Sequence, residues 1–245
     1  MDKQATRFLG LDFQPMTTAE ATRFLAETAS AGAPFTYVVT PNVDHRIRLE
    51  REPELRPLYD AAGLLLNDSR ILELLARRDG IDLPASPGAD IVEALFAGVI
   101  RPDETVTIVG GDAALEAALK ARYGLTDLRR HEPPFGMRKN PDAIAAAAAF
   151  LAANPARFHF LCVGSPQQEM VAHAALELGT ATGVGLCCGA SLDFLSGKTD
   201  RAPAWMRQAR LEWLHRLGSE PGRLARRYLV EGPAIFRIWR RDRRG

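Results

Sequence analysis

The sequence predicts an α/β fold, with a Rossmann-like parallel sheet flanked by helices and a C-terminal helical appendage. Three observations support this prediction. Short apolar runs alternate with stretches of helical periodicity, which is the pattern of parallel strands joined by helices. The runs are apolar at most positions, as expected for strands that are buried on both faces. After Gly197 no strand-like run follows, and the remaining pattern is helical.

The chain divides into a body, residues 1–197, and a basic helical appendage, residues 198–245. Strands in the body are expected at residues 36–39, 64–66, 105–109, 158–163 and 183–187. Helices in the body are expected at residues 17–31, 43–62, 71–78, 112–123, 141–153 and 167–178. Further helices are expected in the appendage, at residues 203–217 and 221–239.

The composition is typical of a globular cytoplasmic protein. The chain has 245 residues, of which 47% are hydrophobic and 25% are charged. No apolar run approaches the roughly 18 residues of a membrane span, and the N-terminus lacks a secretory signal pattern. The cysteines lie in apolar runs without metal-ligand spacing, and the histidines do not cluster. We therefore expect buried, reduced thiols and no bound metal.

Charge is distributed unevenly along the chain. Residues 201–245 contain twelve arginines, no lysine, four acidic residues and all three tryptophans, whereas residues 1–200 have a net charge of −7. A guanidinium forms paired hydrogen bonds with phosphate, and arginine with tryptophan is typical of a phosphate-rich interface that has apolar material behind it. The appendage is therefore expected to meet an anionic surface such as a membrane. The alternative is a solvated helical terminus whose charges bind nothing specific.

Glycine and small polar residues follow each expected strand. The loops are Thr40-Pro41-Asn42, Asn67-Asp68-Ser69, Gly110-Gly111-Asp112, Gly164-Ser165-Pro166-Gln167 and Gly189-Ala190-Ser191. In open α/β sheets, ligands bind in the crevice at the carboxyl ends of the strands. Each loop alone is explained by a strand-to-helix turn, but together the loops predict a ligand crevice.

Asp68 is the carboxylate in these loops that best fits a chemical role. It follows a buried strand, so its side chain is expected to project into the crevice. A carboxylate in that position could deprotonate a sugar hydroxyl as a general base. The alternative is a structural role as the N-cap of the helix expected at residues 71–78.

The sequence offers little sign of a bound metal or dinucleotide. Gly110 and Gly111 could border a nucleotide or a sugar phosphate, but the Gly-x-Gly-x-x-Gly spacing is incomplete. No Asp-x-Asp pair is present to hold a divalent cation against a pyrophosphate. Cationic side chains or helix N-termini are therefore expected to stabilise such a group.

Four segments carry a resemblance to a known family. They are Thr40-Pro41-Asn42 with Asp44, Leu66-Asn67-Asp68, Gly164-Ser165-Pro166-Gln167-Gln168-Glu169, and a C-terminal set of Arg201-Ala202-Pro203, Leu211-Glu212-Trp213, Arg216, Glu220-Pro221 and Arg223. These segments resemble the Thr-x-Asn element, the Pro-Asp-Gly turn, the Gly-x-Pro-(Lys/Arg)-Gln-Glu signature and the C-terminal signature of the WecG/TagA/CpsF glycosyltransferases, glycosyltransferase family 26. The likeness spans residues 36–230.

The resemblance implies a cofactor-free, metal-independent inverting glycosyltransferase, attached peripherally to the inner face of the cytoplasmic membrane. It would move a hexose, N-acetylhexosamine or uronic-acid residue from a UDP-sugar to a polyprenyl-diphosphate-linked acceptor in surface polysaccharide biosynthesis. Asp68 would be the general base, and Arg216, Arg223 and Arg226 would hold the acceptor diphosphate at the membrane. The expected substrate-binding residues are Thr40, Asn42, Gly110, Gly111, Gly164, Gln167 and Glu169.

Three positions depart from the family pattern. Ser69 replaces a glycine, Gln168 replaces a basic residue, and Ala85 lies where the family often has an arginine. The departures leave the sugar open, and they leave open an inactive member that binds lipid-linked sugars. A nucleic-acid-binding protein that uses the arginine-rich tail is a further alternative, although motifs for nucleic-acid recognition are missing, so no nucleic-acid partner is expected.

Overall fold

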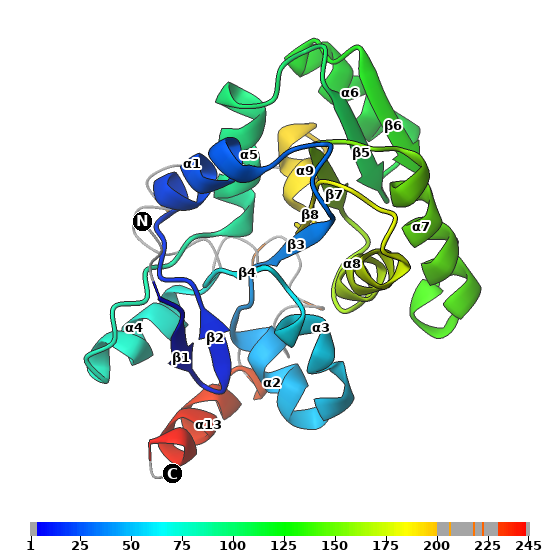
Figure 1. Ribbon diagram of the computed structural model, residues 1–245. Helices are drawn as coiled ribbons and strands as arrows, with labels where there is room; N and C mark the ends of the chain where they lie inside the picture. Colours follow the sequence, from blue (N-terminus) through cyan, green and yellow to red (C-terminus); the bar gives the residue numbers. More distant parts are fainter. Residues whose placement is uncertain (1–3, 200–205, 207–217, 219–221, 223–229, 244–245) are drawn as a thin grey trace.

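A parallel six-stranded sheet forms the centre of the molecule (Figure 1). The computed structural model describes residues 4–199, 206, 218, 222 and 230–243. The strand order is β4-β3-β8-β7-β5-β6. The strands are β3 (Thr36–Val39), β4 (Leu64–Leu65), β5 (Thr105–Val109), β6 (Asp127–His131), β7 (Phe158–Leu161) and β8 (Val184–Cys187). The α/β, Rossmann-like fold class is therefore confirmed.

Helices cover both faces of this sheet and enclose two hydrophobic cores. One core contains residues from α2 (Val43–Arg51), α3 (Pro57–Asp60), α4 (Arg70–Arg78), α7 (Pro141–Ala153), α8 (Gln167–Leu178) and α13 (Ala234–Asp242). The other contains residues from α1 (Thr18–Thr28), α5 (Gly88–Gly98), α6 (Ala113–Tyr123) and α9 (Ser191–Leu195). Successive strand residues alternate between the cores, as Tyr37 and Val38 do, because side chains in a strand point to opposite faces.

A short hairpin near the N-terminus protects one edge of the sheet. It consists of β1 (Thr6–Phe8) and β2 (Leu11–Phe13), which pair in antiparallel fashion. Gln14, which follows β2, accepts a backbone hydrogen bond from Leu65 through its side chain and donates one to Leu65 through its own N–H. These bonds occupy backbone groups of the edge strand β4, which would otherwise be open to pairing with another chain.

Prolines interrupt two of the helices that the sequence predicts. The helix expected at 43–62 was wrong as one unit: α2 ends at Arg51, and a 3₁₀ turn (Pro53–Leu55) leads to α3. In the second case, the described end of the helix expected at 221–239 is interrupted, because α13 begins only after Pro233. Proline has no N–H to donate to the preceding turn, so a helix readily ends before it. The helix expected at 203–217 lies outside the described residues, apart from Met206.

The described end of the expected appendage packs against the body. Figure 1 shows α13 beside α2 and the β1–β2 hairpin. Ile235, Ile238 and Trp239 are buried in the same core as α2 and α4. The Trp239 indole donates a 2.7 Å hydrogen bond to Asp79, and Arg241 forms a 2.6 Å ion pair with Glu50. This helix is therefore part of the folded core rather than a free terminus.

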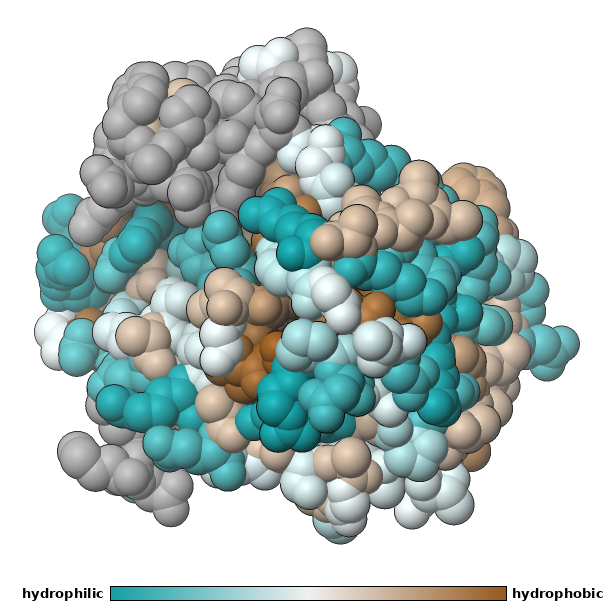
Figure 2. All heavy atoms as spheres, turned by 90° about the horizontal axis from the view of Figure 1, so that it is seen from above, coloured by the Kyte–Doolittle hydropathy of each residue, from teal (hydrophilic) through white to brown (hydrophobic). Residues whose placement is uncertain are grey.

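The coloured part of the surface seen from above mixes hydrophilic, intermediate and apolar residues, and the most hydrophobic ones show only in small separate patches (Figure 2). Within the described ranges, the structure has no helix of sufficient length and apolar character to span a bilayer. A second 3₁₀ turn (Met137–Lys139) precedes α7 and completes the described elements.

Candidate functional site

Asp68 lies at the carboxyl end of β4, where two N–H groups hold its carboxylate. One oxygen accepts a 3.2 Å hydrogen bond from the backbone N–H of Gly88, the first residue of α5. The other oxygen accepts a 3.4 Å hydrogen bond from the side-chain amide of Asn42. Ser69 is the N-cap of α4 and accepts a hydrogen bond from Leu72, so the alternative role of Asp68 as that cap is wrong.

Asn42 combines a structural role with a contact to Asp68. It is the N-cap of α2, and its side-chain oxygen accepts hydrogen bonds from the backbone N–H groups of Asp44 and His45 at 3.0 and 3.4 Å. Because these donors fix the amide oxygen, the amide NH₂ must point the other way, toward Asp68. The first turn of α2 thus orients a donor at the carboxylate.

His45 and Glu169 extend this arrangement along the carboxyl ends of the strands. The imidazole Nδ1 of His45 lies 2.8 Å from the Asn42 side-chain oxygen, and its Nε2 lies 3.7 Å from the carboxylate of Glu169. Glu169 is fully buried in the first turn of α8. Burial raises the pKa of its carboxyl group, but the contacts with His45 and Gln168 lower it by more, so the net pKa lies below the usual range.

Gln168 connects Glu169 with the loop that follows β8. Its side-chain NH₂ donates a 3.0 Å hydrogen bond to Glu169, and its side-chain oxygen accepts a 2.9 Å hydrogen bond from the backbone of Gly189. A continuous polar chain therefore runs from Asp68 through Asn42, His45, Glu169 and Gln168 to Gly189. We call this set the Asp68–Gly189 chain. It joins the segments that follow β4, β3, β7 and β8, including the first turns of α2 and α8.

Thr40 packs beside this chain, against the start of α5. A Cβ atom added to Gly88 would lie only 2.8 Å from the Thr40 hydroxyl oxygen, so glycine permits the close approach. Since Gly88 also donates to Asp68, the same turn brings Thr40 next to the carboxylate. The structure thus places Thr40, Asn42 and Asp68 together, as expected for loops after neighbouring parallel strands.

The predicted glycines Gly110 and Gly111 lie on the other side of Gly189, at a second part of the crevice. A cavity of about 200 Å³ is lined there by Gly111, Leu115, Cys162, Gly189, Leu192, Asp193 and Lys198. Gly110 has a φ of +104°, and a Cβ atom at this position would lie 3.1 Å from the Cys162 carbonyl group. The turn after β5 therefore requires glycine for its backbone conformation and for space.

Charged groups border this crevice cavity. Lys198 forms a 2.7 Å ion pair with Asp112, the N-cap of α6. Burial raises the pKa of the Asp193 carboxyl group, although Lys198 nearby favours its charged form. Because Gly189 lines the cavity and also ends the Asp68–Gly189 chain, the two parts of the crevice share one loop.

The remaining predicted residues are less closely connected. Gly164 has a positive φ of +77° in the turn before α8, and Gln167 begins that helix. The Gln167 side-chain oxygen is buried without a hydrogen-bond partner in the part of the chain that the structure describes. Arg216, Arg223 and Arg226 lie outside the described residues. Among the described residues, no group of three His, Cys, Asp or Glu could hold a metal ion.

Three residues of the Asp68–Gly189 chain were not predicted as site residues: His45, Gln168 and Gly189. Gly189 was noted only as part of a loop that follows an expected strand. His45 was not singled out because a lone histidine on a helix has no distinctive pattern, although its place three residues after a capping asparagine is a signal. Gln168 was noted only as a departure from a basic residue. Its side chain has both an NH₂ donor group and an acceptor oxygen, and it uses one bond of each kind between Glu169 and Gly189.

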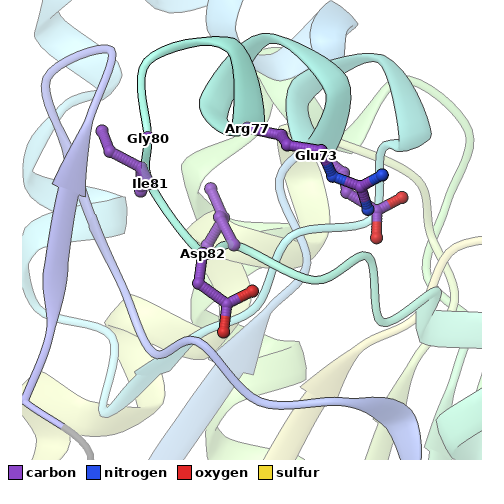
Figure 3. Close-up of a pocket in the computed structure, with 6 residues that line it drawn as sticks. Glu73, Arg77, Gly80, Ile81 and Asp82 are labelled. Carbon is purple, nitrogen blue, oxygen red and sulfur yellow. The ribbon is translucent and has the colours of Figure 1, made fainter.

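A second cavity lies beside α4 (Figure 3). It has a volume of about 230 Å³ and is lined by Glu73, Arg77, Gly80, Ile81, Asp82 and Leu83. Glu73 and Arg77 come from the helix, and the labelled residues Gly80, Ile81 and Asp82 come from the loop that follows it. None of the predicted site residues lines this cavity. The crevice at the strand ends is therefore the better candidate site.

Comparison with known protein families gives a match over nearly the whole chain. A family model described as the glycosyl transferase WecG/TagA/CpsF family matches residues 6–245, which is nearly the whole chain. The match covers all strands of the sheet and every residue of the Asp68–Gly189 chain.

Proposed function

Because the chain belongs to the glycosyl transferase WecG/TagA/CpsF family, we propose that it transfers a sugar from a UDP-sugar to a polyprenyl-diphosphate-linked acceptor. Family membership supports a glycosyltransferase role, whereas the donor, the acceptor and the pathway are part of the proposal. The observation that supports the proposal best is the Asp68 carboxylate, held by Asn42 and Gly88 at the carboxyl ends of the strands. The pathway would be surface polysaccharide biosynthesis.

In the proposed reaction, Asp68 removes the proton from an acceptor hydroxyl group. The resulting oxygen nucleophile attacks the anomeric carbon of the donor, the bond to UDP breaks, and the configuration at that carbon inverts. The two N–H donors would hold the carboxylate in one orientation, which places the base before the acceptor binds. Asp68 is only partly buried, so an acceptor hydroxyl can reach it.

The donor would lie across the crevice between the Asp68 carboxylate and the crevice cavity. The glycine turn after β5 lets a ligand approach the backbone closely, and the first turns of α6 and α8 begin at the same edge. A helix N-terminus favours negative charge, so these turns would help to stabilise the departing UDP without a divalent cation. Thr40 would contact the sugar near Asp68.

The acceptor and the membrane would be bound from the C-terminal side. Arg216, Arg223 and Arg226 would hold the acceptor diphosphate, since arginine binds phosphate through paired hydrogen bonds. The arginine-rich residues 201–245 would attach the protein peripherally to the anionic inner face of the cytoplasmic membrane.

The test is a screen of UDP-sugars against a short lipid-diphosphate-monosaccharide acceptor, read by mass spectrometry. We expect one product whose mass exceeds that of the acceptor by one sugar residue, and we expect it to form in the presence of excess EDTA. The matched control is Asp68→Asn, which removes the base and keeps the size of the side chain. Lack of product with every donor, combined with tight binding of the acceptor, would instead support an inactive member that binds lipid-linked sugars.

A further inference from the structure

We infer that His45 is a positioning residue, which couples the buried carboxylate of Glu169 to Asn42 and thereby fixes the orientation of Asp68. This inference rests on the proposed function, because Asp68 is the base in the proposed reaction. The contacts are continuous: Glu169 lies 3.7 Å from Nε2 of His45, Nδ1 lies 2.8 Å from Asn42, and Asn42 donates to Asp68. His45 itself does not contact Asp68 through any of these bonds.

The ring of His45 is confined from several sides. Its side chain is 11% exposed. It meets the ring of Tyr59 from α3 edge to face, with ring centroids 6.3 Å apart. Glu169 from α8 faces one ring nitrogen, and the capped turn of α2 faces the other. Groups from three helices therefore hold the ring beside Asn42.

The chemistry of imidazole suits this position in either protonation state. Nε2 faces a carboxylate and is therefore expected to carry a proton, since a lone pair in that place would be repelled. A protonated Nδ1 would donate to the Asn42 side-chain oxygen, 2.8 Å away. An unprotonated Nδ1 would accept from the Asn42 backbone N–H, 3.2 Å away. Both states keep His45 bonded to Asn42 and directed at Glu169.

Removing His45 leaves the carboxylate of Glu169 without its imidazole partner in a fully buried place. Glu169 has no solvent-exposed surface, and an uncompensated charge there is strongly unfavourable. The first turn of α8 would then shift, or Glu169 would take up a proton. Either change would reach Gly189 through the side chain of Gln168. Glu169→Gln removes the charge but keeps the shape, so it should offset much of the effect of losing His45.

The test compares His45→Ala, His45→Gln, Glu169→Gln and the double variant His45→Ala with Glu169→Gln. Turnover is expressed per UDP-binding site, measured by calorimetry. We expect His45→Ala to lower kcat by about 10- to 100-fold with the donor KM changed less than about threefold, and His45→Gln to restore part of kcat. The double variant should be no worse than His45→Ala, because residues in one network are not additive.

The matched control is His173→Ala. His173 lies on α8 and also pairs with a carboxylate, Glu177, at 3.6 Å, but it contacts no residue of the Asp68–Gly189 chain through that pair. Its loss should leave kcat unchanged. Wild-type kcat per site in His45→Ala, or fully additive losses in the double variant, would overturn the inference.

A second measurement keeps this inference separate from the proposed function. If wild-type protein transfers no sugar from any UDP donor, the proposed function fails, but the contacts can still be tested. The imidazole ¹⁵N resonances of His45 should then shift in Glu169→Gln and in Asn42→Ala, and should stay unchanged in Asp82→Asn beside the second cavity. Resonances that ignore both Glu169 and Asn42 would show that the coupling does not exist.

Discussion

Two buried histidines in this protein sit in opposite surroundings. His159 is fully buried in the middle of the sheet, where its Nε2–H donates a 2.7 Å hydrogen bond to the Thr182 carbonyl and its Nδ1 accepts from the Thr107 hydroxyl group at 2.6 Å. His45 lies at the carboxyl edge, where it faces the carboxylate of Glu169. One ring has only uncharged partners, and the other has a charged one.

The two histidines show where this fold contains a buried charge and where it does without one. At mid-sheet, burial lowers the pKa of His159 from about 6.5 to about 4, so the ring stays neutral and packs as part of the core. At the strand ends, the Asp68–Gly189 chain holds two carboxylates, Asp68 and Glu169. Buried charge is costly and is rarely needed for stability, which makes the edge cluster the one to test for function.

The largest expected effect is on turnover, when the carboxylate of Asp68 is removed. Asp68→Asn should lower turnover by roughly 10² to 10⁴, because an amide cannot take up the proton of the sugar acceptor's hydroxyl group. The free energy of unfolding should change little, since an amide oxygen can still accept from Gly88. Kinetics and thermal unfolding of the same preparation check this. A folded variant with wild-type turnover would assign Asp68 to the scaffold.

The next effect concerns the neutral histidine. The pKa of His159 is about 4 in the folded protein and about 6.5 when unfolded, so the unfolded chain binds more protons between these values. Stability is therefore expected to fall as pH is lowered from 6.5 to 4, by a total on the order of 3 kcal/mol from this residue. Urea unfolding across that range measures the loss.

The control for the histidine prediction is His159→Gln, which can keep both hydrogen bonds but cannot titrate. Its stability should fall less steeply between pH 6.5 and 4 than that of the wild type. Parallel stability curves for the two proteins would show that His159 is not the acid-sensitive group.

The smallest effect separates two helix caps beside the site. Asn42 caps α2 and Ser69 caps α4, so Asn42→Ala and Ser69→Ala should each cost about 1 kcal/mol of stability. Only Asn42→Ala should also reduce turnover, because the Asn42 side chain donates to Asp68, whereas the Ser69 side chain accepts from Leu72. Equal turnover losses in the two folded variants would mean that capping, and not the contact with Asp68, explains the role of Asn42.

Elements with a strong hydrophobic signal were predictable from the sequence. β3, β5, α7 and α8 have the expected bounds, because each is marked by an apolar run, a cap or a proline. β6 was missed because it is an edge strand with the polar sequence Asp-Leu-Arg-Arg-His, which lacks the apolar run of a buried strand. α5, which begins and ends with glycine, and the five-residue α9 were missed because they carry weak helix signals.

The candidate site was predictable where it depends on strand ends. Thr40, Asn42 and Asp68 lie together because β3 and β4 are neighbours and run in the same direction. The contact between His45 and Glu169 was not predictable, since it depends on how α2 packs against α8. The glycosyltransferase family was correctly identified from short segments that the family match now covers. The roles of Arg216, Arg223 and Arg226 remain predictions.

The pairing of β3 with β8 has a consequence for the order in which the protein can mature. β3 is the first strand of the sheet in the chain and β8 is the last, yet Thr36 pairs with Val184 and Val39 with Cys187. During synthesis, one side of β3 stays unpaired until β8 has been translated, which is near the end of the body. Pairings between segments so far apart in the sequence form slowly. The Asp68–Gly189 chain connects the segments that follow these same two strands. A nascent or truncated chain that lacks β8 is therefore expected to be inert, so that sugar transfer begins only when the last strand closes the sheet.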